Sequence, residues 1–169
     1  TDFGKEIMPN SIVKYKVASY QYDGYWTDIG NIYSFFEANL ALTAEIPPFN
    51  LYDNAQVIYT RARMLPPAKI SGTTLETTII AEASIINASR IEKSVIGIRS
   101  RIGYGTTVVN CYMMGADYFE TLEELANAKT NNTPTIGVGE RCYIKNCIID
   151  KNCRVGNDVK IIGGAHLEA

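Results

Sequence analysis

The sequence predicts a mainly β protein organised around a parallel β-helix, and two observations on its second half support this. Between residues 79 and 162, aliphatic side chains recur at every sixth position, with occasional steps of five. A helix repeats every 3.6 residues and a half-buried strand every two, whereas one strand and corner of a parallel β-helix takes about six. The series consists of Ile79, Ile85, Ile91, Ile96, Ile102, Val108, Val138, Ile144, Ile149, Val155 and Ile161.

The second observation is a repeat on a larger scale. A shift of 53 residues aligns Ile91 with Ile144, Ile96 with Ile149, Arg101 with Arg154 and Gly103 with Gly156. The five-residue step falls at the same place in both copies. Chance alternation in an ordinary sheet is the alternative, and the agreement of two tracts in period and in irregular step favours the β-helix.

The six-residue series also predicts which side chains fill the core. Glycine and asparagine between the aliphatic positions provide the positive φ or the local hydrogen bonds that corners need. A short solenoid exposes strand edges at both ends, so caps or a partner must cover them. We expect these side chains to point inward: Ile85, Ile91, Ile102, Val108, Ile144, Val155 and Ile161.

The segments before and within the solenoid give a domain plan. Residues 1–46 predict a small α/β unit, with an extended segment over 11–21, a turn, and an amphipathic helix from Ile32 to about Thr43. Residues 47–68 predict a proline-bounded linker with an extended segment, and residues 69–169 the β-helix. The six-residue period is interrupted at about residues 115–134, where Thr121 and Glu124 form a plausible capping box and predict a short helix.

Composition narrows the function classes. A net charge of −2 with mixed signs argues against a nucleic-acid surface, and no apolar run approaches the length of a membrane span. The four cysteines form no CxxC pair, so we interpret them as small core or surface residues of a reduced, intracellular protein. The single histidine, His166, is expected in an exposed tail. This disfavours a hexapeptide-repeat acyltransferase, which needs a histidine general base on a coil.

Several collinear motifs resemble ADP-glucose pyrophosphorylase, also called glucose-1-phosphate adenylyltransferase, over essentially the whole chain. They are Asp2–Pro9, Tyr25–Gly30, Phe35–Leu42, Tyr59–Arg61, Leu65–Pro67, Ser94–Gly97, Met113–Tyr118 and Ile148–Asn152. The resemblance implies a left-handed β-helix and assigns residues 1–46 to the end of the catalytic domain. The family's Gly-rich nucleotide loop and first catalytic aspartate have no counterpart here, so we expect a C-terminal piece that is inactive alone.

The resemblance also implies a reaction, an assembly and a location. Glucose 1-phosphate attacks the α-phosphate of ATP, which gives ADP-glucose and pyrophosphate for glycogen or starch synthesis. We therefore expect a homo- or heterotetramer in the bacterial cytoplasm or the plastid stroma, with no nucleic-acid or membrane partner. For this chain by itself, a non-catalytic module for oligomerisation and regulation is the alternative.

Two sets of site residues follow from the resemblance. Asp28 is expected to be catalytic and to bind Mg²⁺, which neutralises and aligns nucleotide phosphates; a structural Asp before Gly30 is the alternative. Trp26, Asp2 and Phe3 are candidates for the sugar site, although Trp26 could equally be a core residue. A phosphorylated metabolite effector is expected to bind Arg61, Arg63 and Lys151, because guanidinium and ammonium groups bind phosphate.

Overall fold

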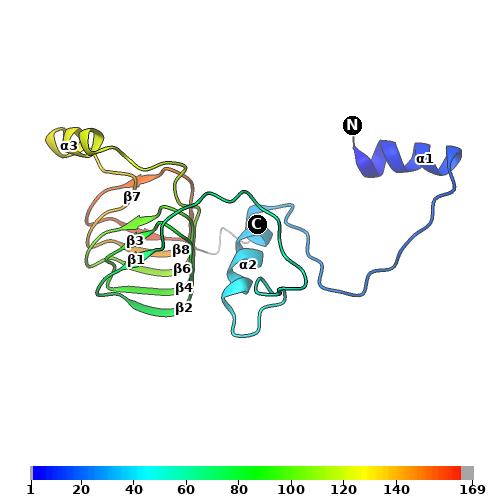
Figure 1. The fold of residues 1–169 in the computed structure, drawn as a ribbon, viewed down its shortest axis with the longest axis horizontal. Helices are drawn as coiled ribbons and strands as arrows, with labels where there is room; N and C mark the ends of the chain where they lie inside the picture. Colours follow the sequence, from blue (N-terminus) through cyan, green and yellow to red (C-terminus); the bar gives the residue numbers. More distant parts are fainter. Residues whose placement is uncertain (1, 165–169) are drawn as a thin grey trace.

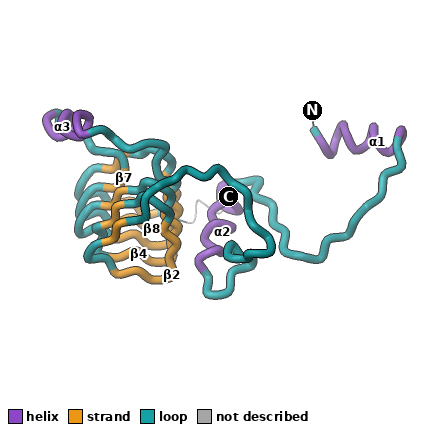
Figure 2. Tube along the Cα trace, viewed as in Figure 1, coloured by secondary structure: helices purple, strands orange, loops and turns teal. Residues whose placement is uncertain are grey.

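The structure is a computed structural model that describes residues 2–164, and it is dominated by a parallel β-helix (Figure 1). Two five-stranded parallel sheets run side by side, one of two-residue strands and one of longer strands (Figure 2). This confirms the predicted mainly β solenoid. The short strands are β1 (Lys69–Ile70), β3 (Ile85–Ile86), β5 (Arg101–Ile102), β7 (Gly137–Val138) and β9 (Arg154–Val155). The longer strands are β2 (Thr74–Ile80), β4 (Arg90–Ile96), β6 (Thr107–Met113), β8 (Tyr143–Ile149) and β10 (Lys160–Ile162).

Each seven-residue strand is bent at its fourth residue. That residue has a positive φ in all four strands: 51° at Thr77, 43° at Lys93, 51° at Asn110 and 52° at Asn146. A residue in the left-handed region turns the chain sharply, so each long strand forms two faces of the coil. The short strand forms the third face. Asparagine adopts this conformation readily, whereas Thr77 and Lys93 give no such signal in sequence.

The register explains the 53-residue repeat. Ile91 is paired with Val108 one coil later, and Val108 is paired with Ile144 in the following coil. The first coil takes 17 residues and the second takes 36, because the second carries an insertion. The repeat is therefore two coils long. Ile91, Val108 and Ile144 form one buried column, and Ile102 and Val138 belong to another.

The expected inward orientation of Ile85 is wrong. Ile86, not Ile85, lies in the column of Ile102 and is fully buried, whereas Ile85 is paired with Arg101 and is only partly buried. Ile79 likewise points outward, and its neighbour Ile80 packs against the core. Both positions are isoleucine doublets, so a six-residue period fits either member. The step from Ile86 to Ile91 is five residues, and only the strand pairing reveals it.

The part before the β-helix is helical, not α/β. It comprises a π-helix at Phe3–Ile7, α1 (Met8–Lys14), α2 (Ile32–Leu40) and a 3₁₀ turn at Ala41–Thr43. The predicted strand over residues 11–21 is wrong: the chain is helical to Lys14 and then runs to Gly30 without a strand partner among the described residues. β-branched and aromatic residues favour a strand only where a neighbouring strand pairs with them.

The helix α2 packs on the outer face of the β-helix. The Phe35 ring meets the Tyr112 ring edge-on, with 5.3 Å between centroids. Tyr112 is paired with Val95 and Ile148, so the long strands carry an apolar column on the outside as well. This outer column explains why Ile79 is aliphatic although it points away from the core.

No described helix is long and apolar enough to cross a bilayer.

The predicted inserted helix is present as α3 (Leu122–Thr130), and it projects from the solenoid on the side of β7 (Figure 1). Its capping box is complete: the Glu124 N–H donates to Thr121 Oγ1 (3.2 Å), and the Thr121 N–H donates to Glu124 Oε2 (2.7 Å). Glu120, just before the helix, is almost fully buried and accepts from Arg154 Nη1 (2.5 Å) and the Ile136 N–H (2.9 Å). This buried carboxylate ties the insertion to the coils.

Candidate anion-binding site

The candidate site begins where the chain leaves β6 to form the insertion. Gly115 adopts φ +84°, and a Cβ there would lie 2.1 Å from the Ile98 carbonyl oxygen, so only glycine fits. The next residue, Ala116, donates its N–H to that same oxygen (2.9 Å). On the following coil, the Asn152 N–H donates to the Gly115 carbonyl (3.1 Å). The base of the insertion is therefore held between two coils.

Asp117 then meets the corner formed by Lys151 and Asn152. Its Oδ1 accepts from Lys151 Nζ (2.9 Å), and its Oδ2 accepts from Asn152 Nδ2 (3.0 Å). The Asp117 N–H in turn donates to Asn152 Oδ1 (2.9 Å). Asn152 has φ 58°, in the left-handed region, so the chain turns sharply at this corner. Both oxygens of one carboxylate are thus bound by residues 34 and 35 positions away.

The cluster pairs one carboxylate with positively charged and polar donors. The Lys151 ammonium and the Asn152 amide hold the pKa of Asp117 below its usual value of 3.8, and the charge of Arg63 lowers it further. Arg63 comes from the linker before β1, so the linker and the coil contribute positive charge to one place. Lys151 and Asp117 both remain half exposed, which leaves the ammonium open to an anion from solvent.

The cluster adjoins the junction with α2. Burial raises the pKa of Tyr112, whose ring packs on Phe35 of α2, and the charge of Lys151 partly opposes this rise. A hollow of about 450 Å³ lies beside the site and is lined from both sides of the junction. The N-terminal side provides Ile29 to Ile32 and Phe35, and the β-helix provides Met114, Ile148 and Asp150. Asp150 directly precedes Lys151 in the chain and accepts from the Lys151 N–H (2.6 Å), so the hollow borders the corner that carries Lys151.

The structure does not bring all the expected site residues together. Arg63 and Lys151 act on one carboxylate, whereas Arg61 is exposed on the linker. Asp28 is exposed and directly precedes Ile29, the first residue that lines the hollow. Its carboxylate lies 3.2 Å from the position that a Cβ on Gly30 would take. Trp26 is 76% exposed and is not a core residue. These roles stay predictions.

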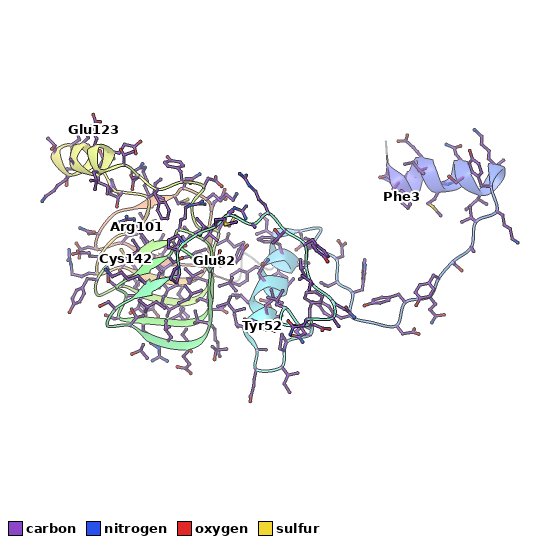
Figure 3. The ribbon with its side chains drawn as sticks, viewed as in Figure 1. Phe3, Tyr52, Glu82, Arg101, Glu123 and Cys142 are labelled. Atoms are coloured by element: carbon purple, nitrogen blue, oxygen red, sulfur yellow. The ribbon has the colours of Figure 1, made fainter. Side chains whose placement is uncertain are left out.

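Asp2 and Phe3 lie apart from the other candidates. Asp2 caps the N-terminal helical segment by accepting from the Lys5 N–H (2.7 Å), and Phe3 is exposed on that segment. Figure 3 shows Phe3 well separated from the β-helix. A single carboxylate such as Asp28 can provide one oxygen ligand to Mg²⁺. Within residues 2–164, no group of three or more potential metal ligands assembles around it.

Sequence reasoning missed two residues of the cluster, Asp117 and Asn152. Both stand in motifs that carry the resemblance, but nothing in a linear sequence pairs residues 35 positions apart. Arg154, which the sequence marks only as a repeat position, binds the buried Glu120. His166 lies outside the described residues.

Comparison with known families settles the fold class. Residues 63–169 match the family model described as the GLGC left-handed parallel beta-helix domain. The chain belongs to this family. The match covers more than half of the chain and agrees with the left-handed solenoid that the resemblance implied. The GLGC family supports a role in ADP-glucose pyrophosphorylase and points to the nucleotidyltransferases, in agreement with the resemblance found in the motifs.

Proposed function

We propose that this chain provides the regulatory and assembly part of an enzyme that makes ADP-glucose and pyrophosphate from ATP and glucose 1-phosphate. In this proposal a phosphorylated metabolite binds as an effector at Lys151 and Arg63, with Arg61 as a further contact. The enzyme would serve glycogen or starch synthesis in the bacterial cytoplasm or the plastid stroma. The β-helix transmits the effector's binding across its junction with α2.

The observation that carries the proposal is the capture of the Asp117 carboxylate by Lys151 and Asn152. A carboxylate with one charge and two oxygens is held by the donors that a phosphate would use. We infer that Asp117 stands in for the effector and must give up Lys151 when the effector binds. The hollow between α2 and Met114 lies beside this point, so binding there would alter the packing of the junction.

Sulfate binding to the 169-residue chain tests this part of the proposal. Sulfate should bind weakly by isothermal titration calorimetry, and Lys151→Ala should weaken it by roughly tenfold through loss of a charge-assisted contact. Asp117→Asn should instead tighten sulfate binding, because it removes the internal competitor and keeps the shape. Arg141→Ala is the control, since Arg141 pairs with Asp158 on a separate corner. Equal affinity in Lys151→Ala and the unaltered chain would contradict the proposal.

Asp28 is proposed to act in catalysis as one ligand of Mg²⁺. When bound, the ion would neutralise the phosphates of ATP. In the complete enzyme, Asp28→Asn should abolish turnover and leave effector binding nearly unchanged. Lys151→Ala should raise the effector concentration needed for regulation and change basal turnover much less. Loss of basal turnover in Lys151→Ala, with regulation intact, would show that the roles are reversed.

Assembly is the second part of the proposal. The end of the solenoid formed by β1 and β2 is not covered by another described strand. Ile70 and Leu75 belong to the inward columns but are 41% and 42% exposed there. Open strand edges with apolar side chains favour pairing with another chain, and we propose a homo- or heterotetramer in the whole enzyme. Monomer mass at high concentration by light scattering would count against self-association of this chain.

The alternative is a module for oligomerisation and regulation that takes no part in chemistry. It differs in one observable: Asp28→Asn in the complete enzyme would then leave turnover unchanged. A hexapeptide-repeat acyltransferase is disfavoured, because residues 2–164 contain no histidine to act as a general base on a coil.

A further inference from the structure

Two of the four cysteines face each other inside the β-helix. Cys111 on β6 and Cys147 on β8 are directly paired in register, and their sulfur atoms are 3.7 Å apart. Directly paired residues on neighbouring strands have Cα atoms about 4.8 Å apart, within the range of roughly 4.4–6.8 Å that a disulfide requires. Small side-chain rotations are therefore enough to join the two sulfurs. Within residues 2–164, Cys142 and Cys153 make no hydrogen bond to another thiol; the Cys142 S–H donates to the carbonyls of Glu140 and Gly156 instead.

The two thiols differ in accessibility and in charge preference. Cys111 is fully buried, and its S–H donates to the Val109 carbonyl (3.1 Å). Cys147 is only partly buried. The contact with Cys147 and burial raise the pKa of the Cys111 thiol, whereas the contact with Cys111 lowers the pKa of Cys147. Cys147 is thus the thiol that more readily becomes a thiolate, and the thiolate is the nucleophile.

A route from solvent reaches Cys147 but not Cys111. Cys147 lines a hollow of about 310 Å³ between α2 and the last coils. Its lining is almost entirely apolar: Ile32, Tyr33, Phe36, Ile148, Ile161 and Ile162. Such a lining admits a small neutral molecule and disfavours a charged one such as glutathione disulfide.

We propose that Cys111 and Cys147 form an oxidation site at which a small hydroperoxide joins them in a disulfide across neighbouring coils. The Cys147 thiolate attacks a peroxide oxygen, the O–O bond breaks, and the released oxygen takes a proton and leaves as water or an alcohol. Cys147 becomes a sulfenic acid. The Cys111 sulfur then attacks the Cys147 sulfur, and its proton leaves with the hydroxyl as water. Two electrons pass from the two thiols to the peroxide.

The crosslink would tie β6 to β8 across the 36 residues that separate the two cysteines. That connection contains α3 and Asp117, so oxidation would fix the base of the insertion relative to the coil below it. This inference does not depend on the proposed function. It rests on the register of the strands, the distance between the sulfurs and the hollow beside Cys147.

The test is peptide mapping of the 169-residue chain after treatment with hydrogen peroxide. Digestion without reductant should yield a Cys111–Cys147 linked peptide that is lighter by two hydrogen atoms than its two parts. Cys147 should react roughly tenfold faster than the buried Cys142, because reactivity follows exposure and thiolate character. Mixing ¹⁵N-labelled and unlabelled chains distinguishes the sources of the link: an intramolecular link gives no hybrid peptides. Hybrid peptides, or no linked peptide at all, would overturn the proposal.

Two single variants separate the roles of the thiols. Cys111→Ser should leave Cys147 as a sulfenic acid that dimedone traps, because the second thiol is missing. Cys147→Ser should leave Cys111 unmodified, because the accessible nucleophile is missing. A thermal unfolding curve of each reduced variant shows whether that variant is folded. If a variant is unfolded, peptide mapping of the unaltered chain still tests whether Cys111 and Cys147 form a disulfide. Direct oxidation of Cys111 in Cys147→Ser would refute the assigned order of attack.

Discussion

The isoleucine doublet at residues 85 and 86 offers a sharp test of the register, because two adjacent residues of the same type face opposite ways. Ile86 has no solvent exposure and stands in the column of Ile102, whereas Ile85 is partly buried and faces outward beside Arg101. Changing either one to alanine removes the same atoms from the same strand. Any difference in stability therefore reports on position alone.

The two substitutions should differ in cost about threefold. Ile86→Ala deletes three carbon atoms from a closed core, which at about 0.8 kcal/mol per methylene loses ~2.4 kcal/mol of burial. The cavity that remains raises this to about 3–4 kcal/mol. Ile85→Ala loses part of the burial and leaves no closed cavity, so about 1 kcal/mol is expected.

Thermal unfolding followed by circular dichroism measures this difference. The β-helix has about 100 residues, and for a domain of that size each kcal/mol corresponds to roughly 4–8 °C in Tm. Ile86→Ala should therefore lower the Tm by about 12–30 °C and Ile85→Ala by about 4–8 °C. The double variant should cost close to the sum of the two. Equal Tm values for the single variants, or a larger loss in Ile85→Ala, would refute the register described for β3.

Three further predictions concern the insertion, the core and acid stability. Glu120→Ala removes a buried carboxylate that binds Arg154 and the Ile136 N–H, so the insertion should become sensitive to limited trypsin digestion at Lys129. Glu123→Ala, at an exposed position, is the matched control. Equal digestion of both variants would contradict the anchoring role of Glu120. Ile102→Asp places an unpaired carboxylate in the core and should prevent cooperative thermal unfolding, whereas a normal unfolding curve would argue against its inward orientation. The pKa of Asp117 is lower in the folded chain than its usual value of 3.8. The ionised carboxylate therefore stabilises the fold at pH values above 3.8, and this contribution is lost as the pH falls through the pKa of the folded state. The difference in unfolding free energy between Asp117→Asn and the unaltered chain, measured in urea at each pH, should therefore shrink below pH 3.8; a difference independent of pH would show that the ion pair contributes nothing.

Elements whose pattern is local could be predicted from the sequence. The period of about six residues follows from the length of one strand and corner, so it is visible in the sequence of a hexapeptide-repeat β-helix such as this one. The α3 helix could be predicted because Thr121 and Glu124 are three residues apart and cap each other without help from the rest of the chain. The α2 helix likewise begins at a local signal, since Asn31 Oδ1 accepts from the Ser34 N–H (2.8 Å).

The N-terminal segment shows where local preference is insufficient. Residues 15–21 contain β-branched and aromatic side chains, yet they form no strand, because no described segment lies beside them to complete the hydrogen bonds. A strand is a property of at least two segments. The sequence of one of them cannot decide whether the other is present.

The six-residue pattern and the capping box were enough to predict that the chain coils and where the coil is interrupted, and the resemblance supplied the basic residues expected to bind an anion. Which member of each isoleucine doublet enters the core follows from the tertiary structure, because that depends on the step between strands and not on the residue type. The tertiary structure also decided that Lys151 meets Asp117 and not solvent alone. Their separation of 34 positions is set by the length of the inserted coil, and the pairing exists only once that coil has closed.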